Sequence, residues 1–342
     1  MRARRFTWIL AALTAVACDV GPSEPTAPFL GAQAELYLIA ALDIMEFNSI
    51  KRYEIDWEAF RAEARAEAAS VAAVTREDTY PAIIAALERI GDNHSFFRAP
   101  DAPPLTYSMA MQQAPERAEP RTDLVAPGIG YVDVPAFSGG GVQGDSLANT
   151  YHELIESVDT LGTSCRWVVD LRGNTGGNMW PMMAGVGPVL GEGDPVGFFV
   201  DPDTVSTPWF YSGGQAGFDD QVIAMADVNY ELASPSPYVA VLTDGETASS
   251  GEAIAVAFRG RPDARSFGEA TWGVSTANAA FPLPDGAVIF LTIATMVDRL
   301  GTVYGGALAP DEVVTGGTKT GDLATDAVLG AAVTWLQAQS CS

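Results

Sequence analysis

Positive charge is scarce in this sequence of 342 residues, which has 19 Lys and Arg residues against 43 Asp and Glu residues and a formal net charge of −24. A protein that binds nucleic acid or a polyanionic cofactor such as coenzyme A needs clustered Lys and Arg to neutralise phosphates. The composition therefore argues against both classes of ligand. Because a large net charge also serves ordinary solubility, it does not by itself indicate a function.

Histidine and cysteine are scarcer still, with two and three residues, and neither occurs at a spacing typical of zinc ligands. We therefore expect no metal site and no cofactor. A Walker-type phosphate-binding loop is also excluded, because no Lys follows the paired glycines of Arg172–Asn178.

Long apolar runs are lacking too. The first one, from Phe6 to Ala17, follows three arginines and is too short to cross a bilayer, but it has the length of a signal-peptide core. It ends in Ala15-Val-Ala-Cys18, which resembles the lipobox of bacterial lipoproteins, although Ala15 replaces the larger apolar residue usual there. Three outcomes stay open: lipidation of Cys18, simple secretion after cleavage, or an uncleaved anchor.

We accordingly expect residues 1–17 to be a signal peptide and the Pro-rich residues 18–28 to be a tether. The protein would then be exported, to the periplasm or to a membrane that it contacts only through an N-terminal lipid. Export places Cys165 and Cys341 in an oxidising compartment, where one disulfide could tie the C-terminal helix to the core.

Composition divides the rest of the chain in two. Residues 29–127 carry apolar residues at helical spacing, which predicts an N-terminal helical region whose last helix Gly91 ends. Residues 128–342 alternate strand-like runs with helices such as Thr150–Leu161, which predicts an α/β domain. The aromatic, loop-rich stretch Gly197–Pro237 either covers a substrate cleft or is an ordinary packed insertion. Strands are expected at Ile129–Val134, Trp167–Leu171, Tyr238–Leu242, Arg265–Gly268 and Val288–Met296.

The stretch from Thr243 to Glu252 has the features of a nucleophile site. The apolar strand Tyr238–Leu242 runs into a short turn, and Ala248–Phe258 has helical spacing, so Ser249 or Ser250 would open a helix. The unpaired N–H groups and the dipole of a helix N-terminus favour a developing oxyanion. On this stretch alone, the serines could equally be helix caps.

Two histidines are available as a base. His152 lies within an amphipathic helix and is expected to be an ordinary helix-face residue. His94 follows the helix stop at Gly91 on a short loop, where it can be held rigidly and still reach a cleft. His94 is therefore the favoured general base. In the α/β domain, backbone N–H groups of Gly176 and Gly177, exposed where a strand ends, could help to hold an oxyanion.

Five segments, which occur in the family's order and span about the whole mature chain, resemble peptidase family S41. They are GDNHSFF (Gly91–Phe97), VVDLRGNTGGN (Val168–Asn178), TASSGEAIAVAF (Thr247–Phe258), FGEATWG (Phe267–Gly273) and YGGALAPD (Tyr304–Asp311). The resemblance implies an α/β fold with a crotonase-like or ClpP-like core preceded by helices. It also implies a serine peptidase that acts on peptides or unfolded proteins.

The resemblance further assigns roles. The tail-specific branch uses a lysine at the position held here by Val274, so its Ser/Lys mechanism is excluded in the usual form. The tricorn-like and nisin-resistance-like branches use a histidine that maps onto His94, with the nucleophile at Ser249 and Ser250 as the alternative. Only Arg98–Pro127 separates His94 from the first core strand, which is too short for a PDZ domain.

In the mechanism expected from these roles, His94 takes the proton of Ser249, and N–H groups of Gly176 or Gly177 and of Ser250 hold the oxyanion. The group that orients His94 stays open, because Asn93 and Tyr304 replace the serine and glutamate of the tricorn pattern. Asn278, Ser275 and Asp311 are the candidates, and a bare dyad is the alternative. Glu252 is expected to fix the turn rather than to transfer protons.

Two rival functions remain. One is a non-catalytic module that binds peptides or hydrophobic ligands on the same fold, which predicts that Ser249 and His94 do not lie within hydrogen-bonding reach. The other is an esterase or amidase with the same dyad, because the acyl-transfer chemistry is shared. The sequence leaves the substrate and the oligomeric state undetermined.

Overall fold

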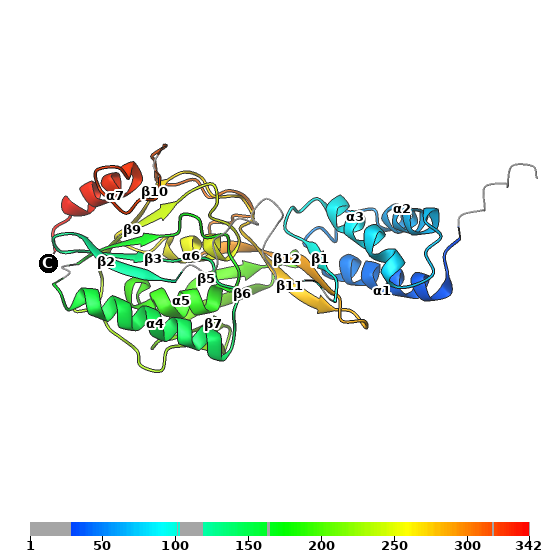
Figure 1. Cartoon of the computed structure of the whole chain (residues 1–342), viewed down its shortest axis with the longest axis horizontal. Coiled ribbons are helices and arrows are strands. Elements are labelled where there is room, and N and C mark those ends of the chain that lie inside the picture. The colour runs from blue at the N-terminus through cyan, green and yellow to red at the C-terminus, as the bar shows by residue number, and fades with distance from the viewer. Residues whose placement is uncertain (1–28, 101, 103–118, 163–164, 317, 342) are drawn as a thin grey trace, which may run out of the picture.

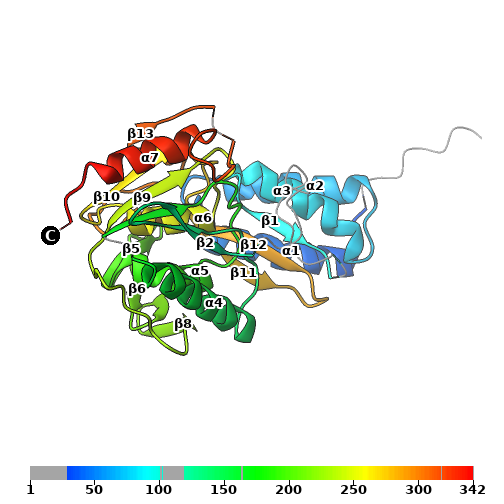
Figure 2. The same cartoon turned by 60° about the vertical axis from the view of Figure 1, so that its left-hand side comes forward.

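The computed structural model describes residues 29–100, 102, 119–162, 165–316 and 318–341, which form helices and two β-sheets. The predicted α/β class is confirmed. The molecule is elongated, with the N-terminal helices at one end and an α/β body at the other (Figures 1 and 2). The expected signal peptide, the tether and Cys18 lie outside the described residues.

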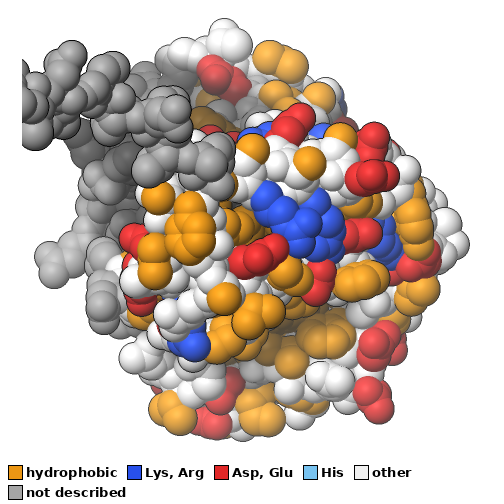
Figure 3. All heavy atoms as spheres, turned by 90° about the vertical axis from the view of Figure 1, so that its right-hand side faces the viewer, with side chains coloured by type: hydrophobic (Ala, Val, Ile, Leu, Met, Phe, Trp, Pro, Cys, Tyr) orange, Lys and Arg blue, Asp and Glu red, His pale blue; other side chains and the backbone are white. Residues whose placement is uncertain are grey.

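The N-terminal end consists of α1 (Ala32–Asn48), α2 (Trp57–Ser70), a short 3-10 turn (Glu77–Thr79) and α3 (Tyr80–Ile90). The Asp56 side chain caps α2 by accepting from the N–H of Ala59, and Gly91 ends α3 in the left-handed conformation, at φ 69°. Basic side chains on this end lie among acidic and apolar ones (Figure 3). Arg61 pairs with Asp43 and Glu46 across α1 and α2.

One sheet is antiparallel and follows the order β1-β12-β5-β6-β7-β8, with β11 also paired to β12. Its strands are β1 (Phe96–Arg98), β5 (Gly193–Val200), β6 (Ser206–Ser212), β7 (Gln215–Phe218), β8 (Gln221–Met225), β11 (Thr276–Pro282) and β12 (Val288–Asp298). The expectation of a loop-rich stretch over Gly197–Pro237 was therefore wrong. This stretch is mostly a four-stranded meander whose short strands, separated by Gly and Asp turns, hide their alternation in the sequence.

The other sheet has the order β13-β10-β9-β4-β3-β2 and is parallel except for β2. Its strands are β2 (Arg121–Ala126), β3 (Ile129–Asp133), β4 (Arg166–Asp170), β9 (Tyr238–Thr243), β10 (Ala264–Gly268) and β13 (Glu312–Val313). Helices α4 (Val142–Asp159), α5 (Met179–Leu190) and α6 (Ser250–Phe258) pack on one face, and α7 (Ala327–Gln337) packs on the other (Figure 2). Burial on both faces explains why these strands are continuous apolar runs. Helix α4 begins eight residues before the predicted Thr150.

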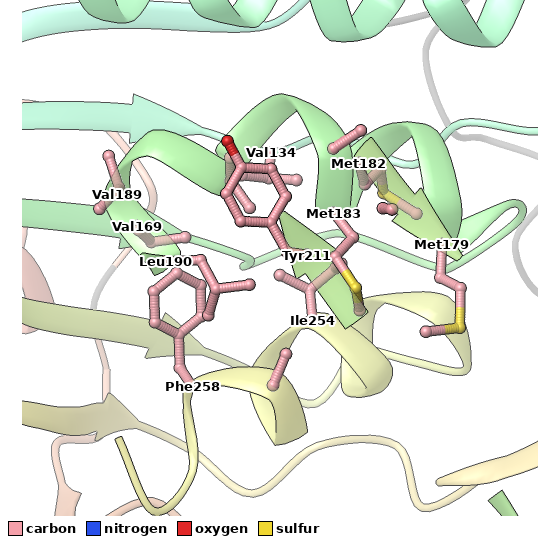
Figure 4. Close-up of a cluster of buried hydrophobic side chains, with 14 of the residues drawn as sticks. Val134, Val169, Met179, Met182, Met183, Val189, Leu190, Tyr211, Ile254 and Phe258 are labelled. Carbon is pink, nitrogen blue, oxygen red and sulfur yellow. The ribbon is translucent and has the colours of Figure 1, made fainter. Parts of the chain in front are cut away.

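The largest core lies between the two sheets. Figure 4 shows Met183 of α5, Tyr211 of β6 and Ile254 of α6 in one cluster with Val134 and Val169 of the parallel-sheet side. Gly187 of α5 lies directly against the Tyr211 ring, where any Cβ would collide with it. Helices α5 and α6 thus pack against both sheets.

A second core joins the N-terminal helices to the β11–β12 hairpin. Ile289 and Leu291 of β12 are buried with Leu38 and Leu42 of α1. At the tip of the hairpin, Asp285 accepts hydrogen bonds from the hydroxyls of Tyr37 and Tyr80, at 2.8 and 2.7 Å. The division of the chain between residues 127 and 128 stays a prediction, since β2 before that point pairs with β3 after it.

A disulfide joins Cys165 to Cys341, a pairing that the sequence left open, and it fixes the end of α7 beside the start of β4. Across the described part of the chain, none of the helices combines the length and the apolar character that a membrane span requires.

Candidate active site

Ser249 lies at the sharp turn between β9 and α6, with φ 52° and ψ −113°. Residues other than glycine rarely adopt such backbone angles, and they persist only where the surroundings enforce them. The N–H of Ala248 donates to the carbonyl of Asn174 at 2.9 Å, and the N–H of Ser249 donates to Glu252 Oε2 at 2.8 Å. The turn therefore presents the Ser249 side chain in one fixed orientation.

Glu252 is fully buried one turn into α6, where its carboxylate accepts four hydrogen bonds. The donors are the N–H of Ser249, the Thr271 hydroxyl, and the N–H groups of Gly273 and Val274, at 2.5 to 3.0 Å. Burial raises the pKa of Glu252, and these hydrogen bonds oppose that rise. Because all four partners donate to it, the carboxylate holds the turn in place.

His94 lies on the loop between α3 and β1. Its backbone N–H donates to Asp92 Oδ1 at 2.9 Å, and Asn93 before it has φ 59°. Its ring Nε2 lies 3.0 Å from Ser249 Oγ, and Nδ1 lies 2.7 Å from Thr276 Oγ1. The structure thus brings together two predicted residues that are 155 positions apart.

The His94 side chain is almost fully buried, which lowers its pKa to about 4, against a smaller opposing effect of Asp92. The imidazole is therefore neutral at neutral pH. When Nδ1–H donates to Thr276 Oγ1, Nε2 is left to accept the proton of Ser249.

Of the three residues predicted to orient His94, Asn278 hydrogen-bonds to its backbone. The Asn278 amide donates to the carbonyl oxygen of His94 at 2.8 Å and accepts from the Thr292 hydroxyl at 2.9 Å, so it holds the backbone and not the ring. The Ser275 hydroxyl instead donates to the carbonyl of Gly306, and Asp311 accepts from Ser266.

Thr276, which the sequence reasoning missed, contacts the ring itself. One signal could have placed Thr276 on a hairpin strand, although not beside His94. The Pro-Asp-Gly turn at residues 284–286 predicts a hairpin, and the strand before that turn contains Thr276.

The backbone N–H groups predicted to hold an oxyanion differ in whether they already donate a hydrogen bond. The N–H of Gly176 donates to Asn174 Oδ1 at 2.9 Å and is already used. Within the described residues, the N–H groups of Gly177 and Ser250 have no acceptor. The Ser250 hydroxyl donates to the carbonyl of Gly177 at 2.8 Å and so points away from His94.

Both glycines are needed where they are. A Cβ on Gly176 would lie 2.9 Å from Cβ of Ser249, and one on Gly177, at φ 116°, would collide with the Phe137 carbonyl. The close approach of this loop leaves the N–H groups of Gly177 and Ser250 beside the Ser249 turn.

Charged side chains also hold the glycine loop in place. Arg172 donates to both oxygens of Asp170 and to both oxygens of Asp326, at 2.7 to 3.0 Å. Asp244 Oδ1 accepts from the N–H groups of Gly173 and Thr247, at 3.1 and 3.0 Å. The glycine loop and the nucleophile turn are thereby tied to one another.

The remaining predicted positions have structural roles. His152 is buried and bonds the Ala184 carbonyl and the N–H of Tyr230, both at 3.0 Å. Val274, at the position of the lysine in the tail-specific branch, is buried. No group of three His, Cys, Asp or Glu side chains that could hold a metal ion occurs among the residues with described positions.

A family model described as peptidase family S41 matches residues 128–314, which is more than half of the chain. The nisin-resistance protein of Lactococcus lactis subsp. lactis is 26% identical over 262 residues, covering 77% of this chain and 74% of that protein. A carboxyl-terminal-processing protease of Picosynechococcus is 28% identical over 195 residues, covering 54% of this chain but only 39% of that protein.

Solved structures of the same fold include a lipoprotein from Streptococcus agalactiae, with a TM-score of 0.67 and 21% identity over 90% of this chain and 98% of that one. The photosystem II D1 C-terminal processing protease has a TM-score of 0.57 and 17% identity, covering 86% of this chain and 96% of that one. At these identities, the likeness concerns the fold.

Proposed function

Because the chain belongs to peptidase family S41, we propose that it is an exported serine peptidase that cleaves peptide bonds with Ser249 as nucleophile and His94 as general base. The observation that carries the proposal is the distance of 3.0 Å between His94 Nε2 and Ser249 Oγ, with Nδ1 held by Thr276 on the other side. A non-catalytic module would have no need to hold these groups in line.

The steps follow from the positions of these groups. His94 Nε2 removes the proton of Ser249 as Oγ attacks the peptide carbonyl, and the N–H groups of Gly177 and Ser250 stabilise the oxyanion. The imidazolium then gives its proton to the leaving amine. Water, activated by the same ring, attacks the acyl-enzyme and releases the acid.

Thr276 is a positioning residue in this scheme. Its hydroxyl accepts from Nδ1–H, which selects the tautomer that leaves Nε2 unprotonated. A hydroxyl carries no charge, so it stabilises the imidazolium less than a carboxylate would. Burial disfavours the same imidazolium, and the low pKa of His94 reflects that cost.

The proposed substrates are peptides or unfolded proteins, and the proposed location is outside the cytoplasm, through a signal peptide over residues 1–17 and a lipid on Cys18. The location is supported by the apolar run that ends at Cys18 and by the lipoprotein of the same fold from Streptococcus agalactiae. The disulfide between Cys165 and Cys341 also fits an oxidising compartment.

A fluorophosphonate probe, which reacts with activated serines, tests the dyad. The wild type should be labelled, whereas Ser249→Ala and His94→Ala should lose at least about a thousandfold in rate. Ser250→Ala is the matched control, because it keeps the backbone N–H of residue 250 and should remain labelled within about tenfold. Labelling that survives Ser249→Ala would contradict the assignment, and so would a folded wild type that does not react.

Peptidase and esterase activity are separated by the products. Denatured protein is incubated with the wild type and with Ser249→Ala, and new termini are identified by mass spectrometry. New termini that require Ser249 support a peptidase. Turnover of simple esters without any new termini would instead assign the same dyad to an esterase.

A further inference from the structure

Strand β1 begins two residues after His94, and its side chains belong to a partly exposed aromatic surface. Side chains alternate along a strand, so Phe96 and Arg98 share one face and Phe97 lies on the other. Phe97 packs against the helical core, with its ring centroid 4.8 Å from that of Tyr80. Phe96 and Arg98 therefore face away from the N-terminal helices.

Phe290 of β12 completes this surface. Its ring stacks on that of Phe96, with centroids 4.6 Å apart and planes 9° apart, and the Arg98 guanidinium carbon lies 5.5 Å from the Phe290 centroid. We call Phe96, Arg98 and Phe290 the β1 platform. The three side chains come from the paired strands β1 and β12 and contact one another.

The β1 platform is continuous with the surroundings of His94. Phe290 and Thr292 alternate with Ile289 and Leu291, which are buried against the helices, so the first two share the opposite face. Thr292 bonds Asn278, which holds the His94 carbonyl. Two strand residues span roughly 7 Å, so the platform begins about that far from the groups that fix the base.

The charge on the platform is unusual for this chain. Most described arginines pair with carboxylates, for example Arg52, Arg61, Arg89, Arg121 and Arg172. Arg98 is half-buried, and among the described residues its guanidinium has no carboxylate partner, although the chain has a net charge of −24. A guanidinium that stacks on a ring keeps its N–H edge available for a carboxylate.

We propose that the β1 platform is a substrate subsite that binds an apolar side chain on the Phe96–Phe290 stack and a neighbouring carboxylate on Arg98. This inference rests on the proposed peptidase function and adds a specificity to it. Arg98 pairs with Val288, four residues along β12 from Thr292, and an extended peptide advances about 3.3 Å per residue, so the carboxylate would lie about four residues from the cleaved bond. It is either the C-terminal carboxylate of the substrate or an Asp or Glu side chain.

The test measures binding to the Ser249→Ala protein, which does not depend on turnover. One pair of fluorescently labelled peptides ends in Ala-Phe and is compared as the free acid and as the amide. A second pair of amidated peptides carries either Glu or Gln at the internal position where the carboxylate is expected. By fluorescence anisotropy at low salt, one acidic member should bind roughly fivefold more tightly than its neutral match. The pair that shows the difference in affinity identifies the source of the carboxylate. Added salt should reduce that difference in affinity.

Three further variants in the same background assign the effect to Arg98. In Arg98→Gln the two members of the pair should bind equally, and in Arg98→Glu the neutral member should bind better. Arg65→Gln, an equal charge change on the exposed face of α2, should keep the original ratio. Equal binding of all pairs to the Ser249→Ala protein, or a ratio that survives Arg98→Gln, would overturn the subsite.

Fluorophosphonate labelling separates this outcome from failure of the proposed function. If the wild type is labelled at Ser249 but the peptide pairs bind equally, the peptidase proposal stands and the subsite is wrong. If the acidic peptide is preferred but no labelling occurs, the platform is a binding site on a protein without the proposed chemistry.

Discussion

The two halves of the candidate site are held by different chemistry. The nucleophile half, at the ends of the parallel strands β4 and β9, is fixed by charged side chains: the buried carboxylate of Glu252, the buried Arg172 ion pairs and the partly buried Asp244. The base half, against the antiparallel strands β11 and β12, has the carboxylate of Asp92, which accepts from the backbone N–H groups of His94 and Ser95, and neutral groups elsewhere. The Thr276 hydroxyl bonds the ring, and Asn278, Thr292 and Ser95 form a chain around the backbone of His94.

The difference matches what each half must do. A strained turn at Ser249 needs strong fixed partners, and a carboxylate that accepts several N–H bonds in a buried place supplies them. In the proposed mechanism the base changes its charge during the reaction, and a fixed carboxylate beside its ring would hold it protonated over a wider pH range. Carboxylates therefore hold the backbone in both halves, whereas the group that bonds Nδ1 of the His94 ring is a neutral hydroxyl.

The largest effect is expected for Glu252→Gln, which breaks the nucleophile half. The amide NH2 would face N–H donors that now point at an oxygen, leaving buried groups unsatisfied. We expect a loss of about 3 kcal/mol in the free energy of unfolding by urea denaturation and a fall of at least about a hundredfold in fluorophosphonate labelling. Glu269→Gln, an exposed carboxylate on a nearby loop, is the control and should stay within about 0.5 kcal/mol. Wild-type labelling in Glu252→Gln would refute this division of roles.

Thr276→Val breaks the base half with a smaller effect. The isosteric change removes the acceptor of Nδ1–H and frees the tautomer of His94, so labelling should fall about 10- to 100-fold. The unfolding free energy should fall by less than about 1.5 kcal/mol. Thr276→Ser restores the hydroxyl and should recover most of the rate. A general packing defect would instead be worse in the smaller serine variant, and that result would argue against a positioning role.

The pH dependence of labelling sharpens the comparison. Burial lowers the pKa of His94 to about 4 from an ordinary value of 6.5, so the ring is still neutral at pH 5.5. The labelling rate at pH 5.5 should therefore stay within about twofold of the rate at pH 7.5. An ordinary histidine would cost about tenfold over this range, and such a fall would show that the base titrates normally.

The same shift affects stability. The unfolded chain binds a proton at His94 near pH 6.5, whereas the folded chain does so only near pH 4. Between these values the unfolded state gains protons first, so the contribution of His94 to folding decreases as the pH falls.

The smallest effect on labelling is expected from removal of the disulfide. Cys165→Ser with Cys341→Ser should lower the free energy of unfolding by about 2 to 4 kcal/mol. It should change the labelling rate of the folded protein by less than about twofold, because the bond lies at the other end of β4 from the glycine loop. A larger change in rate would show that the end of α7 influences the site.

The nucleophile half was largely predictable from sequence. Apolar runs such as Tyr238–Leu242 are buried on both faces, and the segment from Ser250 to Phe258 has a clear helical period, so the turn between them was placed correctly. The positive φ of Ser249 was not predictable, because it depends on Glu252 and Asn174 holding the turn in three dimensions.

The base half was predictable only in part. His94 could be found because a helix stop precedes it, but its ring partner could not, because no spacing in the chain relates His94 to Thr276 across 182 positions. The register of β11 against β12 decides which hydroxyl reaches the ring, and a bulge at Ala277 and Asn278 shifts that register. The β5–β8 meander was missed for a related reason, since its strands are short and their partners are set by tertiary pairing.

The β11–β12 hairpin has a consequence for when the proposed site can form. The ribosome completes His94 long before Ser249, and Thr276 and Thr292 follow later still. The core of α1 to α3 also includes Ile289 and Leu291 of β12. Under the proposed mechanism, a fragment that stops before the hairpin contains His94 and Ser249 but lacks the groups that hold the base in place.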